Sequence, residues 1–383
     1  MRDVWIRGAA MTRFGKHVQR TARDLVEEVV SGSIRDAELE VQDVQAAYVG
    51  NAASGIISGQ ECMRAQTVLR HTGLMGMPIV NVENADASGS TALHLAWQAV
   101  AHGVHDCVVA LGYEKLDHDD RAKSYRAINS GMDLSELSDI FGPRAGQEQS
   151  VLLQFSGAHS RGDGRDRFRT EPLALVAVKN HYHASLNPCA HYQEPVTVEQ
   201  VLAAKPVAGP LTRLMCAPLT DGAACVVLCA ADLKRGRRGG ARIAASVLRS
   251  GRGDDLRLPM TLRAAARSAY EIAGLGPEDL DLAEVHDMTA IAELFVCGEL
   301  GFCPREEVER LVVDRTTWLG GALPVNTSGG LLSETGMPGL QLVIEGVSQM
   351  RGTARLQVPG ARLCVVSNQG GTMHTHSTLL LGN

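Results

Sequence analysis

The two halves of the sequence repeat one order of elements, and this repeat limits the possible folds more than any other feature. Apolar residues at helix spacing predict a helix from Thr21, its N-cap, to Ile34, and then a buried strand over residues 46–51. The second half has the same order, with a helix over residues 262–272 and a strand over residues 282–287.

Each half continues with a turn of small residues, a helix and another buried strand. In the first half the helix follows Gly89 and the strand covers residues 107–112. In the second half the helix covers residues 340–350 and the strand covers residues 363–368. Two βαβ-rich halves of one design predict a layered α/β fold with approximate twofold symmetry.

The repeat also predicts the domain organisation. We expect one half to comprise residues 1–112 and 206–233, and the other to comprise residues 241–383, with a basic, glycine-rich linker between them. Residues 113–205 do not fit the repeat and are polar, so we expect a loop-rich insertion there. A long insertion in a compact fold is more often functional than idle.

Composition excludes several classes of function. The chain has 383 residues, of which 45% are apolar, so it can bury a large core. A net charge of −6 argues against nucleic acid or an anionic membrane as the main partner. Nine cysteines without CxxC spacing fit a reducing compartment, and no apolar run resembles a signal peptide or a membrane span. We therefore expect a soluble, cytoplasmic protein.

The stretch over residues 78–97 presents the strongest candidate for chemistry. An apolar, β-rich run is followed by small residues up to Gly89 and then by a helical pattern, which predicts a strand, a sharp turn and a buried helix. Such a turn holds a side chain at a helix N-terminus, where free N–H groups and the helix dipole favour negative charge. The residue presented there is Asp86.

Several separated motifs, spread along nearly the whole chain, resemble the thiolase superfamily, in particular its branch of sterol carrier protein x thiolases and lipid-transfer-type thiolase-like proteins. The motifs are Asn84-Ala-Asp-Ala-Ser-Gly-Ser-Thr-Ala-Leu93, Lys179-Asn-His-Tyr-His183, Pro218-Leu-Thr-Asp-Gly-Ala-Ala224, Glu284-Val-His-Asp287, Gly298-Glu-Leu-Gly-Phe-Cys303 and Val325-Asn-Thr-Ser-Gly-Gly330. The resemblance implies a thiolase fold with layers in the order α-β-α-β-α. Activity has to be argued separately, from the site.

The resemblance places Asp86 where thiolases have their nucleophilic cysteine. A thiolate can attack a thioester, hold the acyl group and leave again, whereas the acyl adduct of a carboxylate is a mixed anhydride. Thiolases also have a Gly-His-Pro sequence after the second glycine pair, but residues 329–339 contain no histidine. Ordinary thiolase chemistry is therefore not expected.

Residues 329–339 are closer in length to the same segment of thiolase-like retro-aldolases that shorten steroid side chains. Those enzymes have two functional tyrosines, and their positions fall on Gly336 and His286 here. The residues of the known aldolases are thus missing as well.

His286 and Asp287 stand where sterol-carrier-type thiolases have a His-Asp-Cys-Phe motif, whose histidine contributes to an oxyanion hole. A neutral His286 would then polarise a thioester carbonyl, or else it is simply hydrogen-bonded at a strand end. The repeat predicts that His286 and Asp86 meet at one central pocket. Four more residues are expected to bind the substrate or its oxyanion there: Ser88, Gly330, Asn368 and Gly370.

Asp86 has three possible roles. It can cap the following helix in an inactive site. It can act as a general base next to a polarised carbonyl, with a pKa that the helix dipole lowers and burial raises. In the third case, another residue has become the nucleophile, and the candidates are Ser88, Ser90 and Cys62.

Two other clusters are weaker candidates. His181, His183, Cys189 and His191 have the residue types of a metal site, but the resemblance implies a structural role for this stretch and no zinc. Arginines could bind phosphate groups of CoA, although a charge run is more often a solvated face. They are Arg161, Arg165, Arg167 and Arg169.

The sequence thus supports two hypotheses of different classes. In the first, the protein is an enzyme that acts on an acyl-CoA or another acyl thioester, making or breaking a carbon–carbon bond without a cysteine nucleophile. A retro-aldolase of a CoA thioester is one form of this hypothesis. In the second, it is a catalytically silent thiolase-like subunit. The resemblance implies no permanently bound cofactor, a homodimer, and a possible small OB-fold partner with a zinc ribbon.

Overall fold

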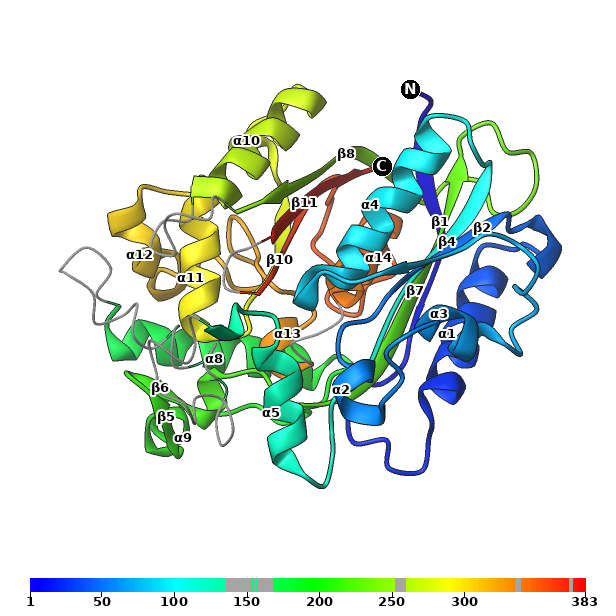
Figure 1. The fold of residues 1–383 in the computed structure, drawn as a ribbon. Helices are drawn as coiled ribbons and strands as arrows, with labels where there is room; N and C mark the ends of the chain where they lie inside the picture. Colours follow the sequence, from blue (N-terminus) through cyan, green and yellow to red (C-terminus); the bar gives the residue numbers. More distant parts are fainter. Residues whose placement is uncertain are drawn as a thin grey trace.

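The computed structural model describes residues 1–135, 150, 153, 156, 168–251, 260–334, 339–371 and 375–383. Its strands alternate with helices along most of the chain (Figure 1). The strands are β1 Val4–Met11, β2 Ala46–Gly50, β3 Ile79–Val82, β4 Cys107–Lys115, β5 Pro206–Ala208, β6 Leu211–Thr212, β7 Asp221–Ala230, β8 Ala241–Ser250, β9 Leu282–Val285, β10 Leu363–Gly370 and β11 Thr375–Gly382.

Most of the helices follow a strand and pack back onto the sheet. They are α1 Ala22–Asp36, α2 Ser54–Ser58, α3 Arg64–Leu69, α4 Ser88–Ala101, α5 Arg121–Asn129, α8 Thr170–Ser185, α9 Val198–Ala203, α10 Met260–Ala273, α11 Ala290–Glu299, α12 Val308–Val313, α13 Gly330–Ser333 and α14 Leu340–Arg351. Two short 3-10 turns bear on the site, η2 Ala85–Ala87 and η3 Arg213–Met215. None of the described helices is long and apolar enough to span a lipid bilayer.

Nine of the strands form one mixed sheet in the order β3-β2-β4-β7-β1-β8-β11-β10-β9. The pairing between β1 and β8, in the middle of this order, is the shortest in the sheet. It consists of Trp5 with Arg242 and Ile6 with Ala241. On either side of this join, each half has its own complete set of paired strands.

The two halves have the same topology. β2 pairs in parallel with β4, which pairs antiparallel with β7; β9 pairs in parallel with β10, which pairs antiparallel with β11. A parallel bridge between Val325 and Ala283 stands where β3 pairs with β2. The repeat predicted from the sequence is confirmed.

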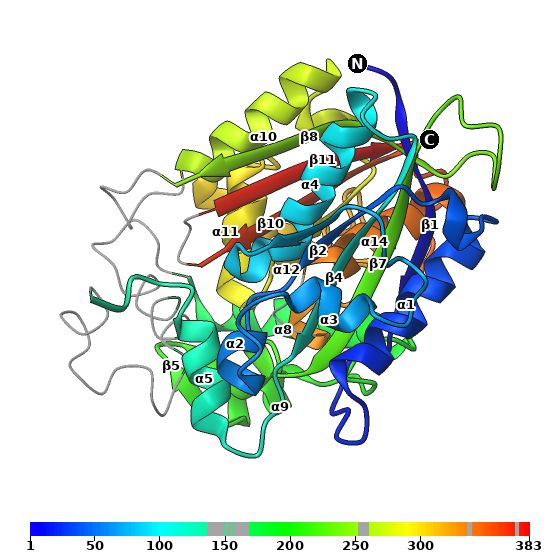
Figure 2. The same cartoon turned by 45° about the vertical axis from the view of Figure 1, so that its right-hand side comes forward.

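Helices α4 and α14 lie between the two halves of the sheet (Figures 1 and 2). Leu93 and Val100 of α4 share one buried cluster with Val343 and Val347 of α14 and with strands of both halves. Helices α1 and α3 cover the outer face of the first half, and α10 and α11 cover that of the second. The layered order α-β-α-β-α is therefore confirmed, and it brings the N-terminus of α4 close to the second half.

The described part of residues 113–205 is more regular than the loop-rich insertion expected from the sequence. β4 continues to Lys115, and the region contains α5, α8 and α9. Helix α8 packs on several sides at once and buries Lys179, Asn180 and His181 along with its apolar residues. A helix that is buried on several sides does not have one apolar and one polar face. Its sequence therefore lacks the helical period, and its polar residues look like those of a surface loop.

Helix α1 begins at the residue that the sequence predicts. Thr21 is its N-cap, with Oγ1 accepting from the Asp24 N–H at 3.2 Å and the Thr21 N–H donating to the Asp24 carboxylate at 2.7 Å. This capping box pairs two backbone donors that would otherwise lack partners.

Thr21→Ala should therefore lower the free energy of unfolding by about 1 kcal/mol, because α1 loses its N-cap hydroxyl. Urea denaturation followed by circular dichroism measures the change. Thr67→Ala is the matched control, since the Thr67 hydroxyl only donates to a carbonyl one turn earlier in α3. Equal losses in the two variants would contradict the assigned role of Thr21.

Candidate functional site

Asp86 lies in a tight turn between β3 and α4. Ala85 has a φ of +48°, an uncommon conformation for a residue with a side chain. The hydroxyl of Ser88 closes the turn, accepting from the Asn84 N–H at 2.9 Å and donating to the Ala85 carbonyl at 2.6 Å. The structure thus places Ser88 in the scaffold of the turn, with its hydroxyl bonded to the backbone.

The second half of the molecule holds this turn through Asn84. Thr375 Oγ1, at the start of β11, donates to Asn84 Oδ1 at 2.8 Å, and Asn84 Nδ2 donates to Thr91 Oγ1 at 2.9 Å. Gly370, at the end of β10, packs against the Asn84 carbonyl so closely that a Cβ atom would overlap it. Gly370 is therefore at the site, as predicted, and what it provides there is close approach between the halves.

The carboxyl group of Asp86 is buried, with 5% of the residue exposed. Burial raises its pKa to about 7, although the backbone N–H of Gly371 donates to the carboxylate and opposes the rise. Desolvation therefore outweighs the stabilisation of negative charge at the helix N-terminus. Asp86 does not cap α4, because the N-cap position is Ala87 and no side chain caps that end.

His286 is joined to the Asp86 turn by the side chain of Asn368. His286 Nδ1 lies 2.6 Å from Asn368 Oδ1, and Asn368 Nδ2 donates to the backbone carbonyl of Asp86 at 3.1 Å and to Ser90 Oγ at 3.2 Å. All of these side chains are buried. The structure thus brings together Asp86, His286 and Asn368, from the two halves, as the repeat predicts.

These hydrogen bonds assign the tautomer of His286. A carbonyl has no proton to donate, so Asn368 must present its NH₂ group to Asp86 and its oxygen to His286. Nδ1 of His286 therefore bears the proton, and Nε2 bears a lone pair. Burial lowers the pKa of His286 to about 4, so the ring is neutral near pH 7. In this form Nε2 accepts a hydrogen bond and cannot donate one to a carbonyl, unlike the oxyanion role considered above.

Asp287 holds the segment that follows the second glycine pair. Its carboxylate accepts from the Leu331 N–H at 2.6 Å and from Asn180 Nδ2 at 2.7 Å. Gly330 has a φ of +67° and packs so closely on Asp287 that a Cβ atom would overlap the carboxylate. The structure thus places Gly330 beside Asp287, where it lets the chain approach this carboxylate.

A buried ion pair is linked to Asp287 through the side chain of Asn180. Lys179 Nζ lies 3.0 Å from Glu293 Oε1, and both residues are almost fully buried. Asn180 Nδ2 and Asn326 Nδ2 donate to the other Glu293 oxygen at 2.7 and 2.9 Å. The sequence motif that contains Lys179 and Asn180 is therefore structural, and it holds Asp287 after β9 and the segment that precedes α13.

The histidines of α8 bind the backbone. His183 Nδ1 lies 2.9 Å from the Asn326 carbonyl, and burial together with the charge of Lys179 lowers its pKa to about 3. His181 Nε2 lies 3.3 Å from the Leu214 carbonyl. In the part of the chain that the structure describes, no group of three or more metal-ligating side chains is placed to hold a metal ion.

Two candidates for a replacement nucleophile have other positions. Cys62 is exposed in the loop between α2 and α3. Ser90 lies beside the Asp86 turn, where Oγ donates to the Ala87 carbonyl at 3.0 Å and accepts from Asn368 Nδ2 at 3.2 Å. Arg169 Nε pairs with Glu309 at 2.6 Å. Several of the candidates lie outside the described residues: Gly336, Arg161, Arg165 and Arg167.

A small cavity of about 60 Å³ adjoins Asp86. Its walls are mainly apolar, and the polar groups at its surface are a carboxyl, two hydroxyls and a guanidinium. The lining residues are Asp86, Leu116, Tyr125, Ile128, Ser150, Leu153, Arg213, Ala217, Pro218, Leu219 and Met288. The sequence motif Pro218-Leu219 belongs to this wall, whereas nothing in the sequence signalled Tyr125, Ser150 or Arg213.

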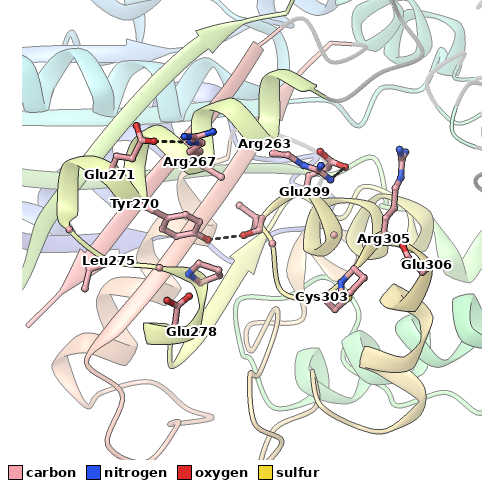
Figure 3. Close-up of a pocket in the computed structure, with 18 residues that line it drawn as sticks. Arg263, Arg267, Tyr270, Glu271, Leu275, Glu278, Glu299, Cys303, Arg305 and Glu306 are labelled. Carbon is pink, nitrogen blue, oxygen red and sulfur yellow. Dashed lines mark hydrogen bonds and ion pairs between the residues drawn. The ribbon is translucent and has the colours of Figure 1, made fainter.

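A larger cleft of about 820 Å³ lies between α10 and the segment that follows α11, and it contains none of the predicted site residues (Figure 3). Its charged groups are mostly paired with one another, as Arg267 is with Glu271 at 2.8 Å and Arg263 with Glu299 at 3.1 Å. Tyr270 Oη donates to the Leu300 carbonyl at 3.1 Å. We therefore assign the chemistry to the smaller cavity at Asp86.

Comparison with known proteins agrees with this geometry. Residues 4–232 match the model of the thiolase N-terminal domain, and residues 247–383 match that of the thiolase C-terminal domain. The chain belongs to the thiolase family.

Relatives within the thiolase family match nearly the whole chain. The chain is 37% identical to an acetyl-CoA acetyltransferase of Methanothermobacter thermautotrophicus, with 97% of each chain covered. It is 33% identical to the benzoylsuccinyl-CoA thiolase subunit BbsB of Thauera aromatica, covering 94% of this chain and 91% of the relative. It is 32% identical to human sterol carrier protein 2, covering 97% and 70%.

A solved structure also aligns with nearly all of this thiolase-family chain. It is described as the Ltp2-ChsH2(DUF35) aldolase, with a TM-score of 0.82 and 25% identity, and the match covers 99% of this chain and 97% of that one. The resemblance to the sterol carrier and lipid-transfer branch is therefore confirmed.

Thr375→Val should destabilise the protein by about 1–2 kcal/mol, because Asn84 Oδ1 loses its donor from the second half. Thr378→Val is the matched control on the same strand. Thr378 is fully buried and its hydroxyl has no hydrogen-bond partner, so the change should be neutral or stabilising. Urea denaturation of both variants measures the difference, and a larger loss at Thr378 would refute the role of Thr375.

Asp86→Asn should gain stability relative to the wild type as pH rises. The pKa of Asp86 is raised from 3.8 to about 7, so the folded state retains a proton that the unfolded chain releases. The stability from this proton is present below the unfolded pKa and lost as pH rises through about 7. We expect the variant to gain about 2–3 kcal/mol between about pH 5 and pH 8.

Urea denaturation across this pH range measures the gain. Asp24→Asn provides the control, because hydrogen bonds from the Thr21 backbone and side chain lower the pKa of Asp24. Asp24 is thus ionised in both states over this range, and its difference from the wild type should not change. A flat difference for Asp86→Asn would show that the Asp86 carboxyl is not held neutral by the fold.

Proposed function

We propose that the protein cleaves or forms a carbon–carbon bond of a CoA thioester by proton transfer through Asp86, as an aldol-type lyase and without a covalent acyl intermediate. The observation that carries this proposal is the place of the Asp86 carboxyl. Asp86 is buried in the first-half turn and lines a small cavity, and its backbone carbonyl accepts a hydrogen bond from Asn368 of the second half.

The proposed cleavage substrate is a β-hydroxyacyl thioester. The Asp86 carboxylate takes the proton of the β-hydroxyl, and the electron pair of that O–H bond forms a carbonyl. The bond between Cα and Cβ breaks, and its electron pair moves into the thioester to give an enolate. The protonated Asp86 then returns the proton to Cα, which yields a shorter acyl-CoA and an aldehyde or ketone.

The pKa of Asp86 suits this role. A general base is most effective when its pKa lies near the operating pH, and burial raises the pKa of Asp86 to about 7. Its fraction ionised at neutral pH is then large enough to accept a proton, while its acid form is strong enough to return one.

The tautomer of His286 also supports a hydroxyl substrate. Nε2 accepts hydrogen bonds, and it has no partner among the residues that the structure describes. Together with the Asp86 carboxylate, it offers acceptors to a substrate O–H group, where a ketone would require donors. We therefore assign His286 the role of holding the β-hydroxyl.

No cysteine replaces the missing nucleophile. Six of the nine cysteines are buried in the interior, and none of the nine lines the cavity at Asp86. Burial also raises the pKa of Cys216, which is close to the cavity in sequence, to about 12, so its thiol stays protonated. This favours proton transfer over acyl transfer.

The proposal includes a partner. The similar solved structure is the Ltp2-ChsH2(DUF35) aldolase, and one relative is described as a subunit of a thiolase. We propose that this chain forms a homodimer and binds a small OB-fold, zinc-ribbon protein of the DUF35 type. With no signal for a bound cofactor and with nine free cysteines, we propose a cytoplasmic enzyme whose substrate brings its own CoA.

The test is incubation of wild-type protein, alone and with its partner, with a panel of β-hydroxyacyl-CoA thioesters. Mass spectrometry should detect shorter acyl-CoA products, and the rate should fall below about pH 7 as Asp86 becomes protonated. Asp86→Asn should lower the rate by about 10²–10⁴-fold because it has no base at this position.

Intact-protein mass with acyl-CoA distinguishes the alternatives. We expect no acyl adduct on the wild type and an adduct on Asp86→Cys, since the variant restores a thiolate at the turn. An adduct on the wild type would overturn the non-covalent mechanism. Cleavage that persists in Asp86→Asn would remove Asp86 from the chemistry.

A further inference from the structure

We propose that Arg213 and Ser150 bind a carboxylate on the acyl chain of the substrate, so that the preferred thioester is the CoA derivative of a short dicarboxylic acid. This inference deepens the function proposed above and rests on it. The supporting feature is a cationic group that lines the same cavity as Asp86, together with apolar side chains.

The backbone around Arg213 is fixed. Arg213 begins η3, its N–H donates to the Lys205 carbonyl at 2.8 Å, and the adjoining Thr212 Oγ1 donates to the Val201 carbonyl at 2.7 Å. Four residues later, the Ala217 N–H donates to the Met288 carbonyl at 2.9 Å. Met288 follows His286 by two residues, so this bond sets the position of the Arg213 segment relative to His286.

Arg213 is an exposed arginine, and none of the ion pairs among the described residues involves it. Other exposed arginines, such as Arg169, Arg235 and Arg242, pair with carboxylates at 2.6–3.0 Å. Among the described residues, no carboxylate lies within ion-pair distance of the Arg213 guanidinium. Its charge is therefore available to an anion that enters the cavity.

Ser150 provides a second and independent indication of a ligand. The residue is 6% exposed, and its hydroxyl is buried in the cavity wall with no hydrogen-bond partner. A buried hydroxyl without a partner is costly, which makes a bound acceptor the natural complement. A carboxylate accepts hydrogen bonds from a hydroxyl and a guanidinium at the same time.

The cavity is lined by one acidic and one cationic side chain, Asp86 and Arg213. An ionised Asp86 repels a carboxylate, whereas Arg213 attracts it, so a carboxylate on the acyl chain is favoured next to Arg213. Leu116, Ile128 and Leu153 belong to the apolar part of the lining, where methylene groups fit. The small volume of about 60 Å³ favours a short chain.

The test is the binding of thioester pairs that match in length and differ in charge, measured by isothermal titration calorimetry. The pairs are succinyl-CoA with butyryl-CoA, and glutaryl-CoA with valeryl-CoA. Wild-type protein should bind the carboxylated member roughly tenfold more tightly. Arg213→Met should abolish this preference and leave the affinity for butyryl-CoA unchanged, and Ser150→Ala should reduce the preference.

Arg126→Met is the matched control, because Arg126 is exposed on α5 and does not line the cavity. It should retain the full preference, and thermal unfolding should confirm that all three variants are folded. Equal affinity of the wild type for both members of each pair would overturn the inference.

The phosphates of CoA are a second possible source of the anion. If Arg213 bound them, Arg213→Met would weaken all four thioesters equally, and that result would also overturn the inference. Succinyl-pantetheine and butyryl-pantetheine lack the nucleotide, and the preference should persist between them. Because these are binding measurements, a preference without β-hydroxyacyl-CoA cleavage would refute only the proposed function, and cleavage without a preference would refute only the assignment of Arg213.

Discussion

The side-chain amide of Asn368 is the interaction on which the site depends. It accepts from His286 in its own half and donates to the backbone of Asp86 and to Ser90 in the other half. Because an amide has a donor side and an acceptor side, the same group fixes the orientation of the turn and the tautomer of the histidine. The fold therefore specifies chemistry here through one polar group that has no freedom to rotate without losing hydrogen bonds.

Desolvation is the second constraint, and it acts in opposite directions on the two titratable groups. It raises the pKa of Asp86 and lowers that of His286, so both favour their neutral forms. The result is a neutral imidazole and a carboxyl group that changes between its acid and carboxylate forms near pH 7, next to an apolar cavity. In the function proposed above, these two groups determine the reaction that the fold supports.

Much of the fold follows from the sequence, because each repeated element has a period and a boundary that a single chain reveals. Thr21 predicts the start of α1, and the apolar runs at 107–112 and 363–368 predict the equivalent strands β4 and β10 of the two halves. Helix α8 is not apparent from the sequence, because Lys179 and Asn180 are polar residues that are buried with polar partners, Glu293 and Asp287. In a sequence, such residues cannot be told from exposed ones. Asp86 could be located from the motif, but its pKa depends on burial by residues far away in the chain.

The remaining site residues could not be predicted for a related reason. Arg213 and Ser150 lie in stretches without periodicity, and they reach the same cavity only through the tertiary fold. Similarly, the tautomer of His286 depends on which side of the Asn368 amide faces the Asp86 carbonyl. The lining of the cavity and the tautomer of His286 both depend on how the two halves are placed relative to each other. The pattern of residues along the sequence does not specify that placement.

The narrow join between β1 and β8 has a consequence for how this molecule would respond to occupancy. In the sheet, two residue pairs between β1 and β8 connect the halves, while the site itself spans them through Asn368 and Thr375. A substrate that contacts Asp86 on one side and the segment after His286 on the other would add a further contact between the halves. A ligand that contacts both halves binds only the folded arrangement, so filling the site would also stabilise the folded chain against unfolding.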